Sequence, residues 1–466
     1  MAAVTRAFPR LPVVVILGCT GTGKSKLAIE IGKRIGGEII SADSMQVYKG
    51  LDIITNKVTT EEMRECKHHM IDFVSPLNEF SVVDFRNMAL PLIEEIKGRG
   101  KIPIVVGGTN YYIESLLWEI LIDNDNKPPE NSDVDDDGVT DIKRRKEMET
   151  ETKINQKFVN TKKEDIKENN KNYKKEFNNV ELHKELQIVD PVMARRIHPN
   201  DTRKIARSLQ VFEQHGRPHS ELLAEQQSKD GGSAYGGPLR FDLTCVFWLH
   251  CEKEILNKRL DSRVDAMLDK GLVQELLEFH GSYNKLRQDD NSRYSEGIFQ
   301  SIGFKEFHNF LVQQQKGDTV NSLIKEEDKK VFDECVEAMK AVTRRYAKKQ
   351  TMWVKNRFLS RPIGSSPNVY ELDATDLSSW ESNVLDRGLG ILENLLQDKQ
   401  PSVDPIARII RDQQSTHVQH TCEVCDNRVI IGDKNWASHL VSKSHKWHLK
   451  KQMKKSDKKE TEKELR

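Results

Sequence analysis

The sequence predicts an α/β fold, a parallel sheet with helices on both faces, joined to a helical insertion domain and a C-terminal Cys2His2 zinc finger. Three observations predict it. Apolar strands alternate with helical segments in the first quarter of the chain. A glycine-rich stretch, Gly18–Ser25, lies between the first strand and the first helix. Two cysteines and two histidines near the end of the chain have the spacing of zinc ligands.

The first half of the sheet is predicted from five segments in order. A β-branched apolar run over Leu11–Gly18 predicts the first strand, and Lys24–Gly36 has helical character. A second short strand, Glu38–Ala42, ends in polar residues. Apolar residues at helical spacing follow over Ser81–Gly98, and Ile102–Val106 predicts a third strand. Strands separated by helices indicate a parallel sheet covered on both faces.

The rest of the chain is less regular. Residues 123–180 hold acidic and basic runs with almost no apolar periodicity, which predicts a disordered polar insertion; an RNA-contacting lysine patch is the alternative. Residues Leu182–Leu223 have helical character. A strand over Leu243–Leu249 should return to the sheet, with one or two helices over Glu252–Phe279. Val331–Phe358 predicts a long basic helix.

The composition excludes several classes of protein. With a formal net charge of +1, the chain has no globally basic surface, so any nucleic-acid-binding surface is local. No stretch approaches about eighteen uninterrupted apolar residues, so we expect no membrane association. The seven cysteines are an odd number, which argues against a secreted disulfide framework and favours a reducing compartment.

The N-terminus has some features of a targeting signal. The first ten residues contain Arg6 and Arg10 and no acidic residue, as mitochondrial transit peptides do. The stretch is short because the glycine-rich loop begins at Gly18, so the alternative that it carries no signal stays open. We expect mitochondrial and cytoplasmic localisation, with the nucleus as a further candidate.

The glycine-rich stretch has the pattern and the context of a phosphate-binding loop. Its glycines let backbone N–H groups converge on phosphate oxygens, and the following helix N-terminus adds partial positive charge. Lys24 can neutralise a phosphate, and Ser25 can ligate Mg²⁺. We therefore predict a P-loop NTPase-like core that binds a diphosphate or triphosphate. The expected binding residues are Gly18, Thr20, Gly21, Thr22, Gly23, Lys24 and Ser25.

The acidic residue expected of a P-loop hydrolase is missing at one strand end. Ile102–Val106 is followed by Gly107 and Gly108 rather than by an acid. The nearest acid at a strand end is Asp43, which should lie beside the phosphate loop at the carboxyl edge of the sheet. It is a candidate metal ligand or general base, with a helix cap as the alternative.

Several further motifs stand out along the chain: Ser41–Asp52, Gly107–Tyr112, His198–Arg203 with Arg207, Ser301–Lys305 and Thr343–Gln350 with Trp353. They resemble the motifs of the tRNA dimethylallyltransferases (tRNA isopentenyltransferases), in the eukaryotic form that carries a C-terminal zinc finger. The resemblance spans roughly residues 13 to 360. Two features depart from the family pattern, the long polar insertion and Lys204, which stands where many members have arginine.

The resemblance implies transfer of a dimethylallyl group from dimethylallyl diphosphate to N6 of adenosine 37 in the anticodon loop of tRNA. The products are N6-isopentenyladenosine and diphosphate, and the catalytic cofactor is Mg²⁺. Asp43 resembles the family's general base, and Lys24 would stabilise the departing diphosphate. Residues implied to contact tRNA are Asp43, Ser44, Met45, Gln46 and Thr109, and, in the helical insertion, Pro199, Asn200, Asp201, Thr202, Arg203 and Arg207.

Some basic residues and a histidine pair can also be interpreted without the resemblance. Arg203, Lys204 and Arg207 form one basic helix face, a pattern that is usually only solvated. The basic helix over Lys340–Lys349 carries interleaved aromatic residues, which favours contact with RNA. The pair His68-His69 has no third ligand nearby, so we interpret it as a surface pair rather than a metal site.

The C-terminal segment has zinc-finger spacing. Cys422 and Cys425 are followed by His439 and His445, so that two thiolates on a hairpin meet two imidazoles on a helix around structural Zn²⁺. A domain this short depends on its metal to fold. The lysines that follow predict non-specific affinity for RNA backbone, with protein docking as the alternative.

Together these features predict a monomer of seven segments and a tRNA prenyltransferase activity. The alternatives are a P-loop nucleotide or small-molecule kinase, and a non-catalytic RNA-binding protein that retains a nucleotide-binding fold. The predicted segments are the first part of the core (1–122), the insertion (123–180), a helical tRNA-binding domain (181–238), the second part of the core (239–360), a linker (361–416), the zinc finger (417–450) and a basic tail (451–466).

Overall fold

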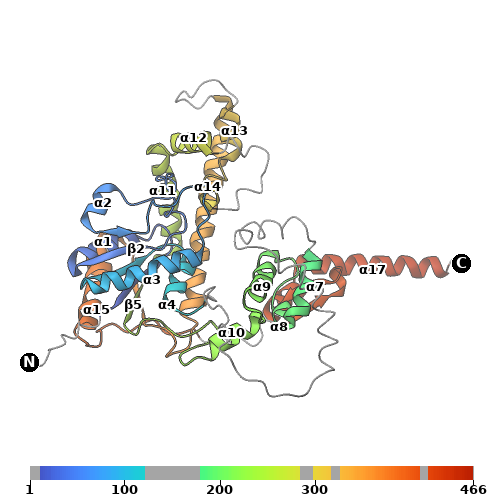
Figure 1. Cartoon of the computed structure of the whole chain (residues 1–466). Coiled ribbons are helices and arrows are strands. Elements are labelled where there is room, and N and C mark those ends of the chain that lie inside the picture. The colour runs from blue at the N-terminus through green and yellow to red at the C-terminus, as the bar shows by residue number, and fades with distance from the viewer. Residues whose placement is uncertain (1–10, 121–178, 284–296, 316–325, 410–417, 465–466) are drawn as a thin grey trace, which may run out of the picture. The chain divides into compact units, whose positions relative to one another are not determined.

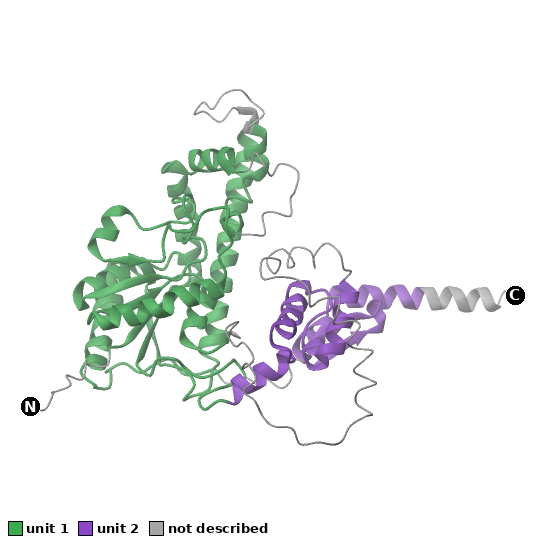
Figure 2. Cartoon of the chain, viewed as in Figure 1, with its two compact units in different colours: residues 1–121, 229–410 green, residues 122–228, 411–466 purple. Residues whose placement is uncertain are grey.

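In the computed structural model the chain forms two compact units, each assembled from two separate stretches (Figure 2). Unit 1 contains residues 1–121 and 229–410, and unit 2 contains residues 122–228 and 411–466. The first ten residues and nearly all of the predicted polar insertion lie outside the described part of the chain. The described residues are 11–120, 179–283, 297–315, 326–409 and 418–464.

Unit 1 is built on a six-stranded parallel sheet with the order β3-β2-β4-β1-β5-β6. β1 lies inside the sheet between β4 and β5, and its six residues are all buried, as expected for an apolar run that is covered on both faces. The parallel pairing aligns Gly18 with Leu249 and Ser41 with Val106, so the loops that follow these strands leave from one edge of the sheet. The strands are β1 (Val13–Gly18), β2 (Gly37–Ser41), β3 (His68–His69), β4 (Ile102–Val106), β5 (Thr244–His250) and β6 (Val369–Asp373).

Helices cover both faces of this sheet, as the sequence predicts. Along β1 the side chains alternate between two cores: Val13 and Val15 belong to one, Val14 and Ile16 to the other. The covering helices are α3 (Val82–Gly98) and α4 (Asn110–Leu117) on the first core, and α1 (Lys24–Ile35) and α15 (Arg387–Leu396) on the second.

A third core extends unit 1 beyond the sheet. It is rich in phenylalanine, with Phe279, Phe304, Phe307 and Phe310 all buried. The long helix α14 runs from this core back to the sheet, where it lies beside α4 (Figure 1). The helices of this part are α11 (Lys253–Asp269), α12 (Leu272–Tyr283), α13 (His308–Gln315) and α14 (Glu326–Trp353), which continues as a π-helix, Val354–Phe358. The short helix α2 (Thr60–Glu65) contacts α1 instead.

A buried ion cluster fastens the end of α14 to α4. The carboxylate of Glu114 is fully buried and accepts hydrogen bonds from Arg357 (2.6 Å), Arg361 (2.7 Å) and Trp353 Nε1 (3.2 Å). Breaking such a buried pair costs about 3–5 kcal/mol, because the remaining charge is left without a partner. The cluster therefore fixes where the last turns of α14 meet the sheet.

The segment predicted as a linker, residues 361–416, is in part a component of the sheet. β6 pairs in parallel with β5, and its side chains Val369, Tyr370 and Leu372 are buried. A π-helix (Glu381–Asp386) and α15 follow it. The prediction failed because this strand has only five residues in a polar, proline-rich context, and partners far away in the sequence determine its burial.

The interpretation of His68-His69 as a surface pair is also corrected. These residues form β3 at the edge of the sheet, and both are half-buried. His69 Nε2 lies 2.7 Å from a carboxylate oxygen of Glu38, and His68 Nδ1 lies 2.7 Å from the carbonyl oxygen of Cys66. They serve to complete the sheet edge.

Unit 2 combines the helical insertion with the zinc finger, which the sequence predicts as separate domains. Residues 229–238, expected at the end of the insertion, belong instead to unit 1, where Gly237 N–H donates to the carbonyl of Glu119. The helical part has its own small core, which includes Leu182, Leu186 and Ile205. Its helices are α7 (Asn179–Val189), α8 (Pro191–Arg196), α9 (Thr202–His215) and α10 (His219–Ser228).

The finger of unit 2 is a two-stranded hairpin followed by two helices. His198, in the turn before α9, connects the helical part to the hairpin, because its Nε2–H donates to the carbonyl of Val429 (3.0 Å). Its Nδ1 accepts the N–H of Asn200 (3.1 Å). The predicted basic tail continues the last helix to Glu464. The elements are β7 (Gln419–Cys422), β8 (Arg428–Ile431), α16 (Asp433–Leu440) and α17 (Lys443–Glu464).

No helix among the described residues combines the length and the apolar character that a membrane span requires.

Candidate active site

The phosphate loop lies between β1 and α1, and its glycines are sterically required. Gly21 and Gly23 have φ values of +82° and +89°, in the left-handed region that favours glycine. A Cβ on Gly21 would lie 2.9 Å from the side chain of Leu260. Thr22 Oγ1 donates to the carbonyl of Cys19 (2.9 Å) and closes the turn. The glycines therefore permit the tight turn that a phosphate loop requires.

Lys24 is the first residue of α1, and its ammonium group forms no ion pair with an acidic side chain among the described residues. Its Nζ donates to the carbonyl of Cys19 (2.8 Å). Removal of the ammonium group from water is the main cause that lowers the pKa of Lys24 to about 8; the positive charge of Arg263 contributes to the lowering, while Cys19 and Asp43 oppose it. An anion bound in the loop would provide the countercharge that the ammonium group lacks.

Asp43 follows β2 and uses one carboxylate oxygen to hold its own turn. Oδ1 accepts the N–H groups of Met45 (2.9 Å) and Gln46 (3.4 Å). Oδ2 has no hydrogen-bond partner among the described residues, and it lies 3.3 Å from the position of a Cβ on Gly108. Asp43 therefore stabilises a turn through Oδ1 rather than capping a helix, and Oδ2 is left available; its role as metal ligand or general base stays a prediction.

The loops after β2 and β4 are joined at the same edge of the sheet. Thr109 Oγ1 accepts the N–H of Ser44 (2.9 Å) and donates to Ser44 Oγ (3.0 Å). A Cβ on Gly107 would lie 2.0 Å from the carbonyl oxygen of Ala42, so only glycine permits this approach of the two chains. Asp43, Ser44 and Thr109 are therefore positioned as one group.

Gln350 on α14 connects this group to the phosphate loop. Its Oε1 accepts the N–H of Thr20 (2.8 Å), and its Nε2 donates to the carbonyl of Gly108 (2.9 Å), which also accepts from Tyr346 OH (3.2 Å). Gln350 is 4% exposed. The sequence predicts that this basic helix contacts RNA. The helix also has a buried face, and Gln350 on that face sets the distance between the phosphate loop and the group formed by Asp43, Ser44 and Thr109.

Gln46 is held by a separate loop. Its Nε2 donates to the carbonyls of Thr55 (3.1 Å) and Asn56 (3.0 Å), and its Oε1 accepts from Ser41 (3.0 Å). Glu275 on α12 in turn accepts the N–H groups of residues 53 and 54, and burial raises the pKa of this carboxyl group.

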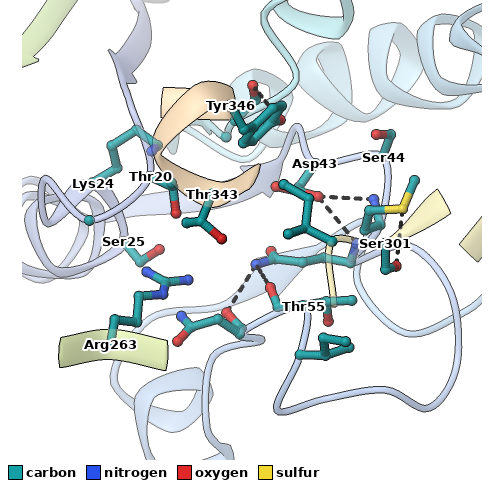
Figure 3. Close-up of a pocket in the computed structure, with 18 of the residues that line it drawn as sticks. Thr20, Lys24, Ser25, Asp43, Ser44, Thr55, Arg263, Ser301, Thr343 and Tyr346 are labelled. Atoms are coloured by element: carbon teal, nitrogen blue, oxygen red, sulfur yellow. Dashed lines mark hydrogen bonds between the residues drawn. The ribbon is translucent and has the colours of Figure 1, made fainter. Parts of the chain in front are cut away.

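A cavity of about 860 Å³ unites these residues within unit 1 (Figure 3). Arg263 on α11 faces it, and burial lowers the pKa of this guanidinium while Asp43 opposes the shift. The sequence reasoning missed Arg263; the available signal was its place on the helix after β5, at the edge of the sheet that carries the phosphate loop. Other lysine and arginine residues at the cavity are Lys24, Lys26, Lys305, Arg345 and Lys349.

The second group of predicted tRNA contacts lies in unit 2. Asp201 caps α9 by accepting the N–H of Lys204 (3.3 Å), and its other oxygen pairs with Lys204 Nζ (2.7 Å). Arg203 is exposed, whereas Arg207 is half-buried and donates to Gln210 (3.0 Å). Pro199 lies in the preceding turn. An open groove is lined by Asn179, His198, Asn200, Asp201, Thr202 and Arg203.

The four predicted zinc ligands converge in the finger. Their ligand atoms lie within 4.8 Å of one another. His445 Nδ1 is 3.5 Å from Cys422 Sγ, 3.6 Å from Cys425 Sγ and 3.2 Å from His439 Nε2. A tetrahedral site with bonds of about 2.0–2.3 Å places neighbouring ligand atoms roughly 3.5 Å apart. The cluster is therefore compatible with structural zinc.

Comparison with known proteins agrees with this geometry. The family model described as IPP transferase matches residues 46–357. A solved structure of a eukaryotic dimethylallyltransferase acting on tRNA superposes with a TM-score of 0.74 at 29% sequence identity, covering 97% of this chain and 100% of that one.

Curated relatives match over almost the whole chain. The tRNA dimethylallyltransferases of Homo sapiens and Mus musculus are each 50% identical to it, over 95% and 97% of this chain and 86% and 90% of their own length. The Saccharomyces cerevisiae tRNA dimethylallyltransferase is 33% identical over 96% of this chain and 94% of its own length. The chain therefore belongs to the IPP transferase family, among the tRNA dimethylallyltransferases.

Proposed function

We propose that the protein transfers the dimethylallyl group of dimethylallyl diphosphate to N6 of adenosine 37 in the anticodon loop of tRNA. The observation that carries this proposal is the single cavity in which the phosphate loop and Asp43 are held together by Gln350. The relatives named as tRNA dimethylallyltransferases support the same reaction. In it, a bond forms between N6 and the allylic carbon, the carbon–oxygen bond breaks, and diphosphate leaves with the bonding electrons.

The phosphate loop stabilises the leaving group in this reaction. Negative charge grows on the diphosphate as the allylic bond breaks, and the loop N–H groups, Lys24 and Arg263 lie at the cavity to neutralise it. Ser25, exposed in the first turn of α1 and facing the cavity, fits the role of a ligand to Mg²⁺. When bound, Mg²⁺ would add positive charge beside the diphosphate.

The free oxygen of Asp43 is suited to take the proton from the attacking amine. N6 of adenine is a poor nucleophile because its lone pair is delocalised into the ring, so a base within hydrogen-bond reach is needed. The backbone N–H groups that hold Oδ1 fix the direction of Oδ2. Asp43 is therefore proposed as the general base.

The acceptor adenine has to leave its stack to reach the cavity. Ser44, Met45 and Gln46 line the cavity, and Thr109 holds Ser44 by accepting its backbone N–H. These residues are proposed to contact the flipped base and its neighbours. In unit 2, the groove residues from Asn200 to Arg203, with Pro199 and Arg207, are proposed to bind the anticodon stem.

A labelled-substrate assay tests the function. The protein is incubated with unmodified tRNA, Mg²⁺ and labelled dimethylallyl diphosphate, and in parallel with ATP and candidate phosphate acceptors. We expect label on the tRNA, at the adenosine of position 37 and not in a tRNA with guanosine there. ATP-dependent phosphorylation without transfer of label would instead support the kinase alternative.

Diphosphate binding should weaken above about pH 8. The low pKa of Lys24, about 8, means that its ammonium form is lost in the free protein as pH rises through this value. Bound diphosphate favours the charged form, so above that pH each further unit weakens binding by up to about tenfold. Calorimetric titration with inorganic pyrophosphate between pH 7 and 9.5 measures how the dissociation constant changes with pH.

Lys24→Arg is the matched control for this pH dependence, because a guanidinium stays charged throughout the range. The ratio of the two dissociation constants, wild type to Lys24→Arg, should rise with pH. A constant ratio would show that Lys24 does not titrate in this range.

Zinc should be required for the fold of the finger. Structural zinc contributes roughly 10–16 kcal/mol in isolated fingers, far more than a small hydrophobic core provides. Cys422→Ser should therefore lose bound zinc and make the segment after residue 417 sensitive to protease. Cys335→Ser, at a buried cysteine of unit 1, is the control and should retain zinc. Equal zinc content in both variants, measured by mass spectrometry of the metal, would contradict the assignment.

A further inference from the structure

The segment beyond the family match packs against the phosphate loop. The IPP transferase model ends at residue 357, whereas the sheet of unit 1 gains β6 and the turn that follows it. Arg259 on α11 anchors this turn by donating to the carbonyls of Ala374 (2.6 Å) and Thr375 (2.5 Å). The chain next reaches Trp380, which is 4% exposed.

The indole ring of Trp380 lies directly against the backbone of Gly23. A Cβ on Gly23 would lie 2.7 Å and 2.9 Å from two ring carbons, and its three nearest atoms would all belong to Trp380. Gly23 immediately precedes Lys24 and adopts the left-handed conformation at the start of α1. The ring therefore occupies the space that any side chain at Gly23 would need.

Two contacts hold the indole ring against α1, and an ion pair holds the residue that follows it. Trp380 Nε1–H donates to Glu30 Oε2 (2.8 Å), and the ammonium group of Lys26 lies 4.6 Å from the ring centroid. One residue later, Glu381 pairs with Arg34 (3.2 Å). These contacts hold the ring in one orientation, whereas hydrophobic burial alone would permit several.

We propose that Trp380 is a positioning residue for the phosphate loop: it holds the Gly23–Lys24 backbone in the conformation that receives the diphosphate of the prenyl donor. The inference rests on the proposed function. It adds a part of the active-site framework that lies outside the family match. Its physical basis is that the loop N–H groups must converge on phosphate oxygens, and a displacement of about 1 Å can cost about a hundredfold in rate.

The experiment compares Trp380→Ala with Trp380→Phe. The alanine variant removes the ring that packs against the backbone of Gly23. We therefore expect the dissociation constant for inorganic pyrophosphate and the KM for dimethylallyl diphosphate to rise about tenfold or more. The KM for tRNA should stay unchanged. Trp380→Phe keeps an aromatic ring against Gly23 and loses only the hydrogen bond to Glu30, so it should restore most of the affinity.

Ile391→Ala is the matched control for lost packing. Ile391 is buried on α15 in the same hydrophobic core as Trp380. The Ile391→Ala variant should lower Tm, as Trp380→Ala does, but it should leave pyrophosphate binding unchanged. If Trp380→Ala lowers Tm but keeps the wild-type pyrophosphate and donor constants, the ring only packs and the proposal is overturned.

A variant that fails to fold does not end the test. Trp380→Leu keeps apolar bulk in the hydrophobic core but removes the flat ring from the backbone of Gly23, so it should fold and still weaken pyrophosphate binding several-fold. Wild-type pyrophosphate binding by Trp380→Leu would overturn the proposal. Pyrophosphate binding needs no prenyl transfer, so a wild-type protein that binds pyrophosphate but does not prenylate tRNA would refute the proposed function and leave this inference to be judged by binding alone.

Discussion

Replacing Asp43 with asparagine should slow transfer of the dimethylallyl group to tRNA by about 10²–10⁴-fold, the contribution typical of a general base. The amide oxygen can still accept the N–H of Met45, so the turn after β2 should keep its shape. The amide nitrogen cannot take a proton from the attacking amine. The rate under single-turnover conditions, with saturating tRNA and labelled dimethylallyl diphosphate, measures the loss.

Two further measurements assign this loss to the carboxylate. Pyrophosphate should bind to Asp43→Asn at least as well as to wild type, because Lys24 and the loop N–H groups are unchanged. Asp52→Asn is the matched control, since Asp52 is an exposed carboxylate that pairs with Lys57 (2.6 Å). Equal turnover by wild type and Asp43→Asn would remove the assignment of Asp43 as the base.

Lys24→Ala should nearly abolish turnover. Loss of one donor that stabilises developing charge costs on the order of 3–4 kcal/mol, or about 10²–10³-fold in rate. Unlike Asp43→Asn, this variant should also bind pyrophosphate more weakly, because the ammonium group contacts the leaving group before and after the reaction. Titration with pyrophosphate and the single-turnover rate together distinguish the two roles.

Lys33→Ala provides the control on the same helix. Lys33 is about half exposed and pairs with Glu65 (2.7 Å) at the far end of α1, where an exposed ion pair contributes about 0–1 kcal/mol. It should retain wild-type turnover. Unchanged pyrophosphate binding and turnover in Lys24→Ala would refute the proposed role of the loop.

Much of the fold and two of the sites follow from the sequence because their determinants are local. The phosphate loop depends on glycines and a lysine within eight residues of each other, and the backbone geometry follows from these residue types. The zinc ligands likewise occur at a recognisable spacing. β1, β4 and α1 are predicted nearly to their observed ends, because apolar runs and helical periodicity mark them directly.

Contacts between distant parts of the chain could not be predicted in this way. Gln350 reaches Thr20 across 330 residues, and Arg263 faces the same cavity from another helix. The position of β6 is set by its pairing with β5. Its five residues in a polar context form too weak a pattern to predict a strand from the sequence. Side-chain identity at these positions is uninformative until the fold brings partners together.

The sequence by itself determined which chemistry this protein has: a loop for a diphosphate, a carboxylate at the edge of the sheet and a Cys2His2 cluster. Only the tertiary structure decided how these groups work together. In the folded chain, one carboxylate oxygen of Asp43 accepts hydrogen bonds within its own turn, and the other is left available for substrate. The fold also places Trp380 against Gly23. The physical reason is that residue type sets what a group can bind, whereas distance and orientation come from packing between segments far apart in the chain.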